Sequence, residues 1–172
     1  MRKWIFPILA LLCFVGESIF VQVLPSEMYE LERIIVPRFV MVMIVIITMY
    51  SNLQLGMSYG IVLGLLYDLM YTNLIGVYMF AYPLLAYFIT LTMKILHINI
   101  LTVTVCSLFS ITLLEFFVYG VQLLIKGTNL EVVDFLNIRL LPTLVLNLAF
   151  VILFYIPLRK RFNLLLVAQK DD

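Results

Sequence analysis

Long apolar runs separated by short polar segments make up almost the whole chain. Each run approaches the roughly 20 apolar residues that a helix needs to cross a bilayer, and somewhat shorter runs cross where other helices shield them. The runs predict six transmembrane helices, over about residues 5–24, 34–52, 57–71, 77–93, 100–125 and 138–156. The expected fold is therefore an all-α integral membrane bundle, with one polytopic domain over residues 1–172.

The charges between the runs indicate the orientation of the chain. Six crossings put both termini on one side, and cytoplasmic loops carry an excess of Lys and Arg. The basic residues on the side of the termini are Arg2, Lys3, Lys94, Arg159, Lys160, Arg161 and Lys170. On the other side, the basic residues Arg33, Arg38, Lys126 and Arg139 are diluted by the acidic residues Glu27, Glu30, Glu32, Glu131 and Asp134. We therefore expect both termini to be cytoplasmic.

Composition supports a membrane protein and narrows the classes of function. The hydrophobic fraction is 65%, the charged fraction is 12% and the mean hydropathy is +1.15, whereas soluble domains are about 25% charged. A net charge of +1 argues against a strongly basic nucleic-acid binder. The amino terminus, MRKWIFPILALLCFVGESIF, begins like a signal peptide but lacks a small-x-small cleavage site, so it is expected to stay as the first helix.

Ionisable and polar residues inside the predicted helices are the main candidates for a functional site, because such residues are costly in lipid and normally face protein or water. The carboxylates are Glu17, Asp68 and Glu115, and each falls in the outward half of its helix. The last helix adds Arg139, Thr143 and Asn147 at four-residue steps, which put them on one face. We expect a shared polar pocket that opens outward, with Asp68 and Glu115 close to Arg38 or Arg139.

Structural roles for the same residues remain open. Asp68 and Glu115 are equally well read as hydrogen-bond partners between helices, and Asn147 as a residue that holds helices together. Glu17 lies close enough to the outer end of its helix to reach the interface. Arg38 and Arg139 stand at helix starts, where basic residues often anchor a helix at the membrane surface.

Glycines in the stretch Gly60 to Tyr78, GIVLGLLYDLMYTNLIGVY, predict a close contact between helices. Gly60 and Gly64 are four residues apart, and small residues at this spacing let a second helix approach. The second helix could belong to the same chain or to a partner protein. Gly76 punctuates the following turn and is placed with these two glycines in the packing or partner-binding seam.

No catalytic or metal-binding constellation is visible. His97 is the only histidine and lies beside Lys94 at the cytoplasmic edge, which argues against both a Ser–His dyad and a multi-histidine metal site. Cys13 and Cys106 sit in apolar runs and are expected to be buried free thiols. A proton or ion pathway is disfavoured because the acids cluster toward one side of the bilayer. We therefore expect a protein that is not an enzyme and has no cofactor or metal.

Several short motifs resemble the rod shape-determining MreD family. They are ESIF at residues 17–20, VPRF at 36–39, G-x-x-x-G-L-x-x-D at 60–68 followed by Tyr71 and Gly76, LLEFFVYGVQ at 113–122 and RLLPTLVLN at 139–147. Each motif alone is weak in a membrane protein, but their order and spacing cover most of the chain. The ESIF and PRF details are most similar to members from Bacillus-like bacteria. Many Gram-negative members carry an acid where this chain has Arg38, so no acidic role is transferred to that position.

The resemblance implies a fold similar to the S components, or substrate-binding subunits, of energy-coupling-factor vitamin transporters. It implies a non-enzymatic scaffold and regulator of the cell-elongation complex in the bacterial cell membrane, which influences cell shape and side-wall peptidoglycan synthesis. The partners implied are MreC, through its membrane helix, together with MreB, RodZ, RodA and a class B penicillin-binding protein. The alternative from another class is a small-molecule-binding subunit of an energy-coupling-factor-type transporter, which would hold its ligand in the outward pocket. A lipid-modifying enzyme is also conceivable but would need a reactive dyad.

Overall fold

The computed structural model describes residues 5–23, 34–72, 74–125, 128 and 130–170, and within these it leaves out the side chains of Ile5 and of residues 157–170. The charged residues of the amino terminus, of the segment 24–33 and of the region 157–172, on which the predicted orientation largely depends, lie outside the described side chains. The described elements are α1 (Ile5–Val23), α3 (Phe39–Tyr50), α4 (Leu53–Tyr71), α5 (Val77–Thr92), α6 (Ile100–Leu124), α7 (Val132–Asp134), the π-helix η2 (Phe135–Leu140) and α8 (Leu141–Lys170).

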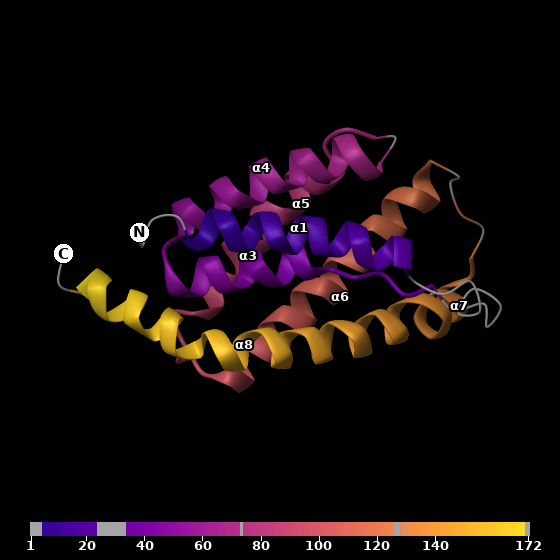
Figure 1. The fold of residues 1–172 in the computed structure, drawn as a ribbon. Helices are drawn as coiled ribbons and strands as arrows, with labels where there is room; N and C mark the ends of the chain where they lie inside the picture. Colours follow the sequence, from indigo (N-terminus) through magenta and orange to yellow (C-terminus); the bar gives the residue numbers. More distant parts are fainter. Residues whose placement is uncertain (1–4, 24–33, 73, 126–127, 129, 171–172) are drawn as a thin grey trace.

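Helices make up the bundle, in agreement with the all-α prediction. Four helical stretches are long and apolar enough to cross a membrane, namely Phe6–Val23, Leu53–Tyr71, Ile100–Leu124 and Val132–Ile156. Two further apolar helices are shorter, with 12 residues in α3 and 16 in α5. The chain is thus a multi-pass membrane protein. The start of α1 and the end of α8 lie at the same end of the bundle (Figure 1).

The centre of the bundle is α3. All 12 of its residues are buried, and residues 40–47 have 0% exposure. It contacts α1, α4, α5, α6 and α8, which surround it in Figure 1. A helix that is apolar on every side is expected in such a place, because no polar face needs water. The other helices instead turn large apolar side chains outward, such as Leu12 at 62% and Leu153 at 74% exposure, as lipid contact requires.

The start of α3 corrects the predicted boundary of the second span. Residues 34–38 are not helical, and the helix begins at Phe39 instead of about residue 34. Pro37 lacks an N–H group, and a residue before proline, here Val36, avoids the α conformation. The apolar run already begins at Ile34, so hydrophobicity alone did not reveal that the helix starts later.

Two further boundaries also differ from the prediction. The third helix begins at Leu53, because the side chain of Asn52 accepts a hydrogen bond from the N–H of Leu55 at 2.9 Å and caps the helix. The last helix is preceded by α7 and a π-helical turn and continues to Lys170, beyond the predicted end near residue 156.

Candidate functional site

The non-helical segment 34–38 is held by η2 and by the start of α8. The N–H of Ile34 donates to the carbonyl of Ile138 at 2.9 Å. The N–H of Val36 donates to Oγ1 of Thr143 at 3.1 Å. Backbone groups without helical partners cannot face lipid and must be satisfied by the protein. The face of α8 predicted from the four-residue spacing therefore supplies partners to an unwound backbone.

Asn147 makes two hydrogen bonds to the backbone of this segment. Its Oδ1 accepts from the N–H of Arg38 at 2.9 Å, and its Nδ2 donates to the carbonyl of Val36 at 3.1 Å. The same Nδ2 also donates to the carbonyl of Thr143 at 2.7 Å. Asn147 and Thr143 are both fully buried. One amide thus replaces the two backbone bonds that a regular helix would have formed here.

Glu17 of α1 lies at the amino end of α3. Its Oε2 accepts from the N–H of Val40 at 3.1 Å, so a carboxylate meets the positive end of the helix dipole. The N-cap residue itself, Arg38, makes no side-chain capping bond. Glu17 is only 2% exposed, so the interpretation that it reaches the membrane surface is wrong. Among the described residues, its second oxygen has no hydrogen-bond partner.

A buried ion network joins the non-helical segment 34–38 to α6 and η2. Oε1 of Glu115 lies 2.6 Å from both Nε and Nη2 of Arg38, and Oε2 accepts from Nε of Arg139 at 2.9 Å. Glu115 is 0%, Arg38 1% and Arg139 14% exposed at the side chain. Arg38 is therefore not a surface anchor. Because both carboxylate oxygens are engaged, Glu115 bridges the two cations.

Two tyrosines complete the surroundings of Arg38. Its Nη1 donates to the hydroxyl of Tyr67 at 3.0 Å. Its guanidinium carbon lies 5.6 Å from the ring centre of Tyr67 and 5.2 Å from that of Tyr78. Both distances are within the range of a cation–π contact. These tyrosines were missed as site residues, and their only signal was the Tyr67/Tyr71 and Tyr78/Tyr82 spacing on facing helices.

Asp68 does not join the network, which corrects its expected pairing with an arginine. Its carboxylate instead accepts from the N–H groups of Gly76, Tyr78 and Met79 at 2.8, 3.0 and 3.0 Å. Asp68 is 0% exposed. It therefore ties the end of α4 to the first turn of α5, where free N–H groups favour an anion. Gly76, with φ of +110°, provides the left-handed turn that this connection needs.

Gly60 and Gly64 lie where α4 packs against α5. A Cβ on Gly60 would stand 2.8 Å from the backbone nitrogen of Pro83, and one on Gly64 would stand 2.7 Å from Cα of Met79. Real Cβ atoms essentially never approach so closely. The contact of these two glycines is thus with a helix of the same chain.

A polar pocket of about 370 Å³ opens beside the ion network. It lies where α3 begins, α4 and α6 end and α5 begins. Its walls include Arg38, Tyr67, Tyr78, Val118, Gln122 and Arg139. Among the polar residues singled out in the sequence, the two arginines line this pocket, whereas Glu115 and Asp68 do not.

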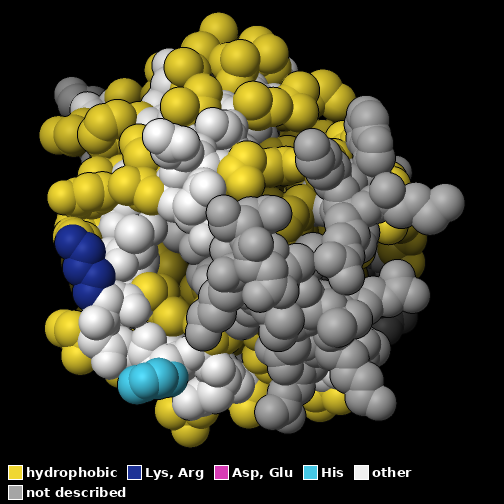
Figure 2. Space-filling model, turned by 90° about the vertical axis from the view of Figure 1, so that its left-hand side faces the viewer, with side chains coloured by type: hydrophobic (Ala, Val, Ile, Leu, Met, Phe, Trp, Pro, Cys, Tyr) yellow, Lys and Arg dark blue, Asp and Glu magenta, His cyan; other side chains and the backbone are white. Residues whose placement is uncertain are grey.

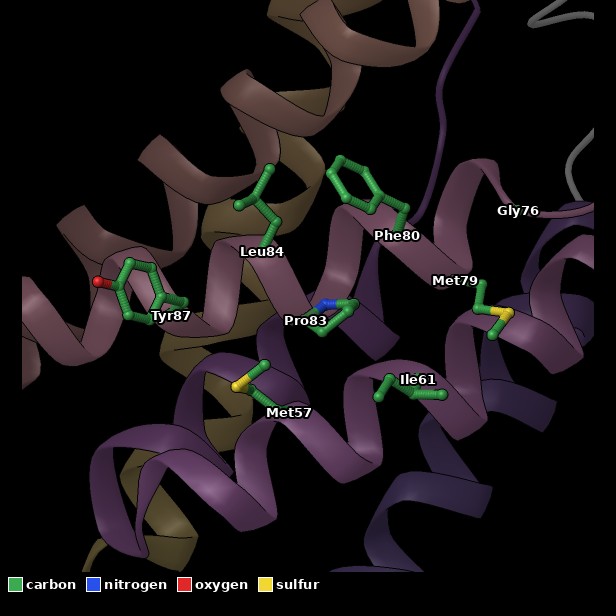
Figure 3. Close-up of a pocket in the computed structure, with 8 residues that line it drawn as sticks. All are labelled: Met57, Ile61, Gly76, Met79, Phe80, Pro83, Leu84 and Tyr87. Atoms are coloured by element: carbon green, nitrogen blue, oxygen red, sulfur yellow. The ribbon is translucent and has the colours of Figure 1, made fainter.

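A second, apolar hollow of about 530 Å³ lies along the outer side of α4 and α5. Figure 3 shows Met57 and Ile61 on α4 beside Met79, Pro83 and Tyr87 on α5. Ile61 is 40% and Leu84 37% exposed. Gly60 and Gly64 pack against Pro83 and Met79, which line this hollow. We call it the α4–α5 groove.

The described residues offer little for catalysis. They contain no group of three His, Cys, Asp or Glu side chains that could hold a metal ion. Glu115 and Asp68 have their oxygens engaged by the protein, and neither touches solvent. The arrangement is suited to fixing the positions of helices and to presenting two arginines to a pocket.

Comparison with known proteins gives a consistent match along the whole chain. The family model described as rod shape-determining protein MreD matches residues 2–165. The rod shape-determining protein MreD of Bacillus subtilis (strain 168) is 33% identical over 172 residues, which is 100% of both chains. No solved structure gives a match, so the expected likeness to S components has no support from known structures.

Proposed function

The chain belongs to the MreD family of rod shape-determining proteins, and from this membership we propose that it is a non-enzymatic scaffold of the cell-elongation complex. The observation that carries the proposal is the similarity to a rod shape-determining protein over the full length of both chains. The buried network agrees with it, because charges fixed by one another hold helices in place and do not turn over a substrate.

We propose six membrane crossings with both termini in the cytoplasm. The 12 residues of α3 rise only about 18 Å. The extended residues 34–38 add about 16 Å, and together they match a hydrocarbon core of about 30 Å. Non-helical backbone is tolerated at membrane depth only where protein surrounds it. Here the side chains of Thr143 and Asn147 accept hydrogen bonds from this segment.

The charge on the end of the bundle that carries the termini supports this orientation. On this end, Figure 2 shows Lys or Arg and His side chains but no Asp or Glu among the described side chains in view. The exposed residues Lys94 and His97 lie between α5 and α6. The polar pocket would then face outward.

MreC is the partner that we propose for direct contact, with its single membrane helix seated in the α4–α5 groove. Helices associate in lipid through close van der Waals packing, and a concave apolar surface offers more of it than a flat one. Met57, Met79 and Phe80 line the groove, and methionine adapts to an irregular partner surface. MreB, RodZ, RodA and a class B penicillin-binding protein would act in the same assembly to direct side-wall peptidoglycan synthesis.

Depletion tests the function. When the chain is depleted from its rod-shaped host, we expect cells to widen and become round while labelled precursor incorporation into the side wall falls. Cells that stay rod-shaped with normal wall growth would refute the proposal. The transporter alternative makes a different prediction, which is loss of uptake of a small solute with cell shape preserved.

A further inference from the structure

The polar pocket beside the ion network is positively charged. The described residues that line it include Arg38 and Arg139 and no acidic residue. The nearby carboxylate, Glu115, is 0% exposed and uses both oxygens to hold these arginines. An anion entering the pocket would therefore meet two cations without meeting their counter-charge directly.

Several hydrogen-bond donors of residues that line the pocket are unused. Within the described part of the chain, Arg139 donates only through Nε, to Glu115, which leaves its two terminal NH₂ groups for another acceptor. The side chain is 14% exposed. Tyr78 and Gln122 also line the pocket, and neither side chain makes a hydrogen bond to any described residue.

The chemistry of these donors points to a phosphate group. A guanidinium presents its N–H groups in a planar fork that matches phosphate oxygens and binds them in pairs. Glu115 fixes the rotation of Arg139 through Nε, so less conformational entropy is lost on binding. The remaining wall is partly apolar, including Val77, Val118 and Val121, which suits the part of an amphiphile next to its headgroup.

We propose that this pocket is a binding site for a phosphate-bearing anion, with Arg139, Tyr78 and Gln122 as its direct contacts and Arg38 as the cation behind them. Its volume of about 370 Å³ is at the lower end for ligand sites, so it would hold a headgroup and leave the chains in the bilayer. The phosphate could belong to a membrane lipid or to a soluble phosphate compound. The site needs no partner protein, so its test is separate from that of the scaffold function.

The test is native mass spectrometry of the purified full-length chain, titrated with phosphatidylglycerol or phosphatidylcholine and competed with inorganic diphosphate. We expect phosphatidylglycerol to bind more tightly than phosphatidylcholine and to be displaced by diphosphate. Arg139→Gln should weaken binding about tenfold or more, as expected for a charged hydrogen bond. Lys94→Gln, which removes the same charge at the other end of the bundle, should leave binding unchanged.

Tyr78→Phe and Gln122→Leu keep the ion network intact and decide the matter if Arg139→Gln does not fold. Each should weaken binding about threefold to tenfold, as for a neutral hydrogen bond. Diphosphate binding that depends on these residues, without a preference among lipids, would support the site and assign a soluble ligand. Binding that falls equally in Arg139→Gln and Lys94→Gln, or that ignores both Tyr78→Phe and Gln122→Leu, would overturn the proposal.

Discussion

Arg38 and Glu115 form an ion pair with side-chain exposures of 1% and 0%, although they stand 77 positions apart in the chain. The pair joins the start of the central helix α3 to the middle of α6. It stands where the backbone of residues 34–38 is extended and depends on side chains for its hydrogen bonds. The ion pair and these hydrogen bonds together hold the start of α3, and Arg38 also lines the polar pocket.

Removing the charge of Glu115 should destabilise the bundle strongly. Glu115→Gln would remove the carboxylate that pairs with the buried Arg38 and with the largely buried Arg139, and breaking a buried pair in this way costs about 3–5 kcal/mol. Thermal unfolding of the purified protein in detergent should show a clear loss of stability. Glu131→Gln is the matched control because Glu131 is exposed and makes no capping bond. Equal melting temperatures for the two variants would show that the ion network does not stabilise the bundle.

The hydroxyl of Thr143 should contribute to stability because it accepts a hydrogen bond from the backbone of the extended segment. Thr143→Val keeps the shape of the side chain but leaves the N–H of Val36 unpaired, at a cost of about 1–3 kcal/mol. Thr104→Val is the control, since the Thr104 hydroxyl only bonds the carbonyl of Ile100 in its own helix. Unfolding in increasing concentrations of denaturing detergent measures the difference. A control that loses as much stability as Thr143→Val would contradict the assignment.

Asn147 can be tested as both donor and acceptor. Asn147→Asp keeps an oxygen for the N–H of Arg38 but loses the donor to Val36. Asn147→Leu loses both. We therefore expect both variants to be less stable than the wild type, because each leaves buried backbone groups of this segment without a partner. Amide hydrogen exchange should rise first at residues 34–38, and exchange that is unchanged there would argue against this role.

The α4–α5 contact should tolerate no side chain at Gly64. Gly64→Ala places a Cβ 2.7 Å from Cα of Met79, and forcing atoms into a packed contact costs about 1–3 kcal/mol. Gly120→Ala is the control, because nothing lies within 4 Å of a Cβ there, and alanine is the better helix former. We expect lower thermal stability for Gly64→Ala and an equal or higher value for Gly120→Ala. The reverse order would show that the seam is not tight.

Asp68 should stabilise the turn between α4 and α5. Asp68→Asn retains one acceptor oxygen and loses the charge at the helix start, for which we expect a cost of about 1–2 kcal/mol. In this variant, amide hydrogen exchange should be faster at Gly76, Tyr78 and Met79, whose N–H groups donate to the carboxylate. Asp134→Asn, at an exposed position, controls for loss of an acid. Protection that persists in Asp68→Asn would remove Asp68 from this role.

The sequence predicted the type of element well, but it predicted less well which partners the polar side chains contact. Runs of apolar residues gave the helical elements, and the four-residue spacing put Thr143 and Asn147 on one face. Asp68 was misassigned because its partners are backbone groups only 8–11 positions further along the chain, which no charge pattern reveals. The extended residues 34–38 were missed because an apolar run has the same appearance whether it is helical or unwound, and Pro37 was the only local sign.

Co-purification of MreC with groove variants tests the scaffold account most directly. Ile61→Trp combined with Leu84→Trp fills the α4–α5 groove from both helices, while Leu153→Trp adds the same ring at a lipid-facing position of α8 that is 74% exposed. We expect the groove variant to accumulate and melt like the wild type, to lose MreC and to produce round cells, with Leu153→Trp unaffected in all four respects. Normal recovery of MreC with the groove variant, in cells that remain rods, would contradict the account.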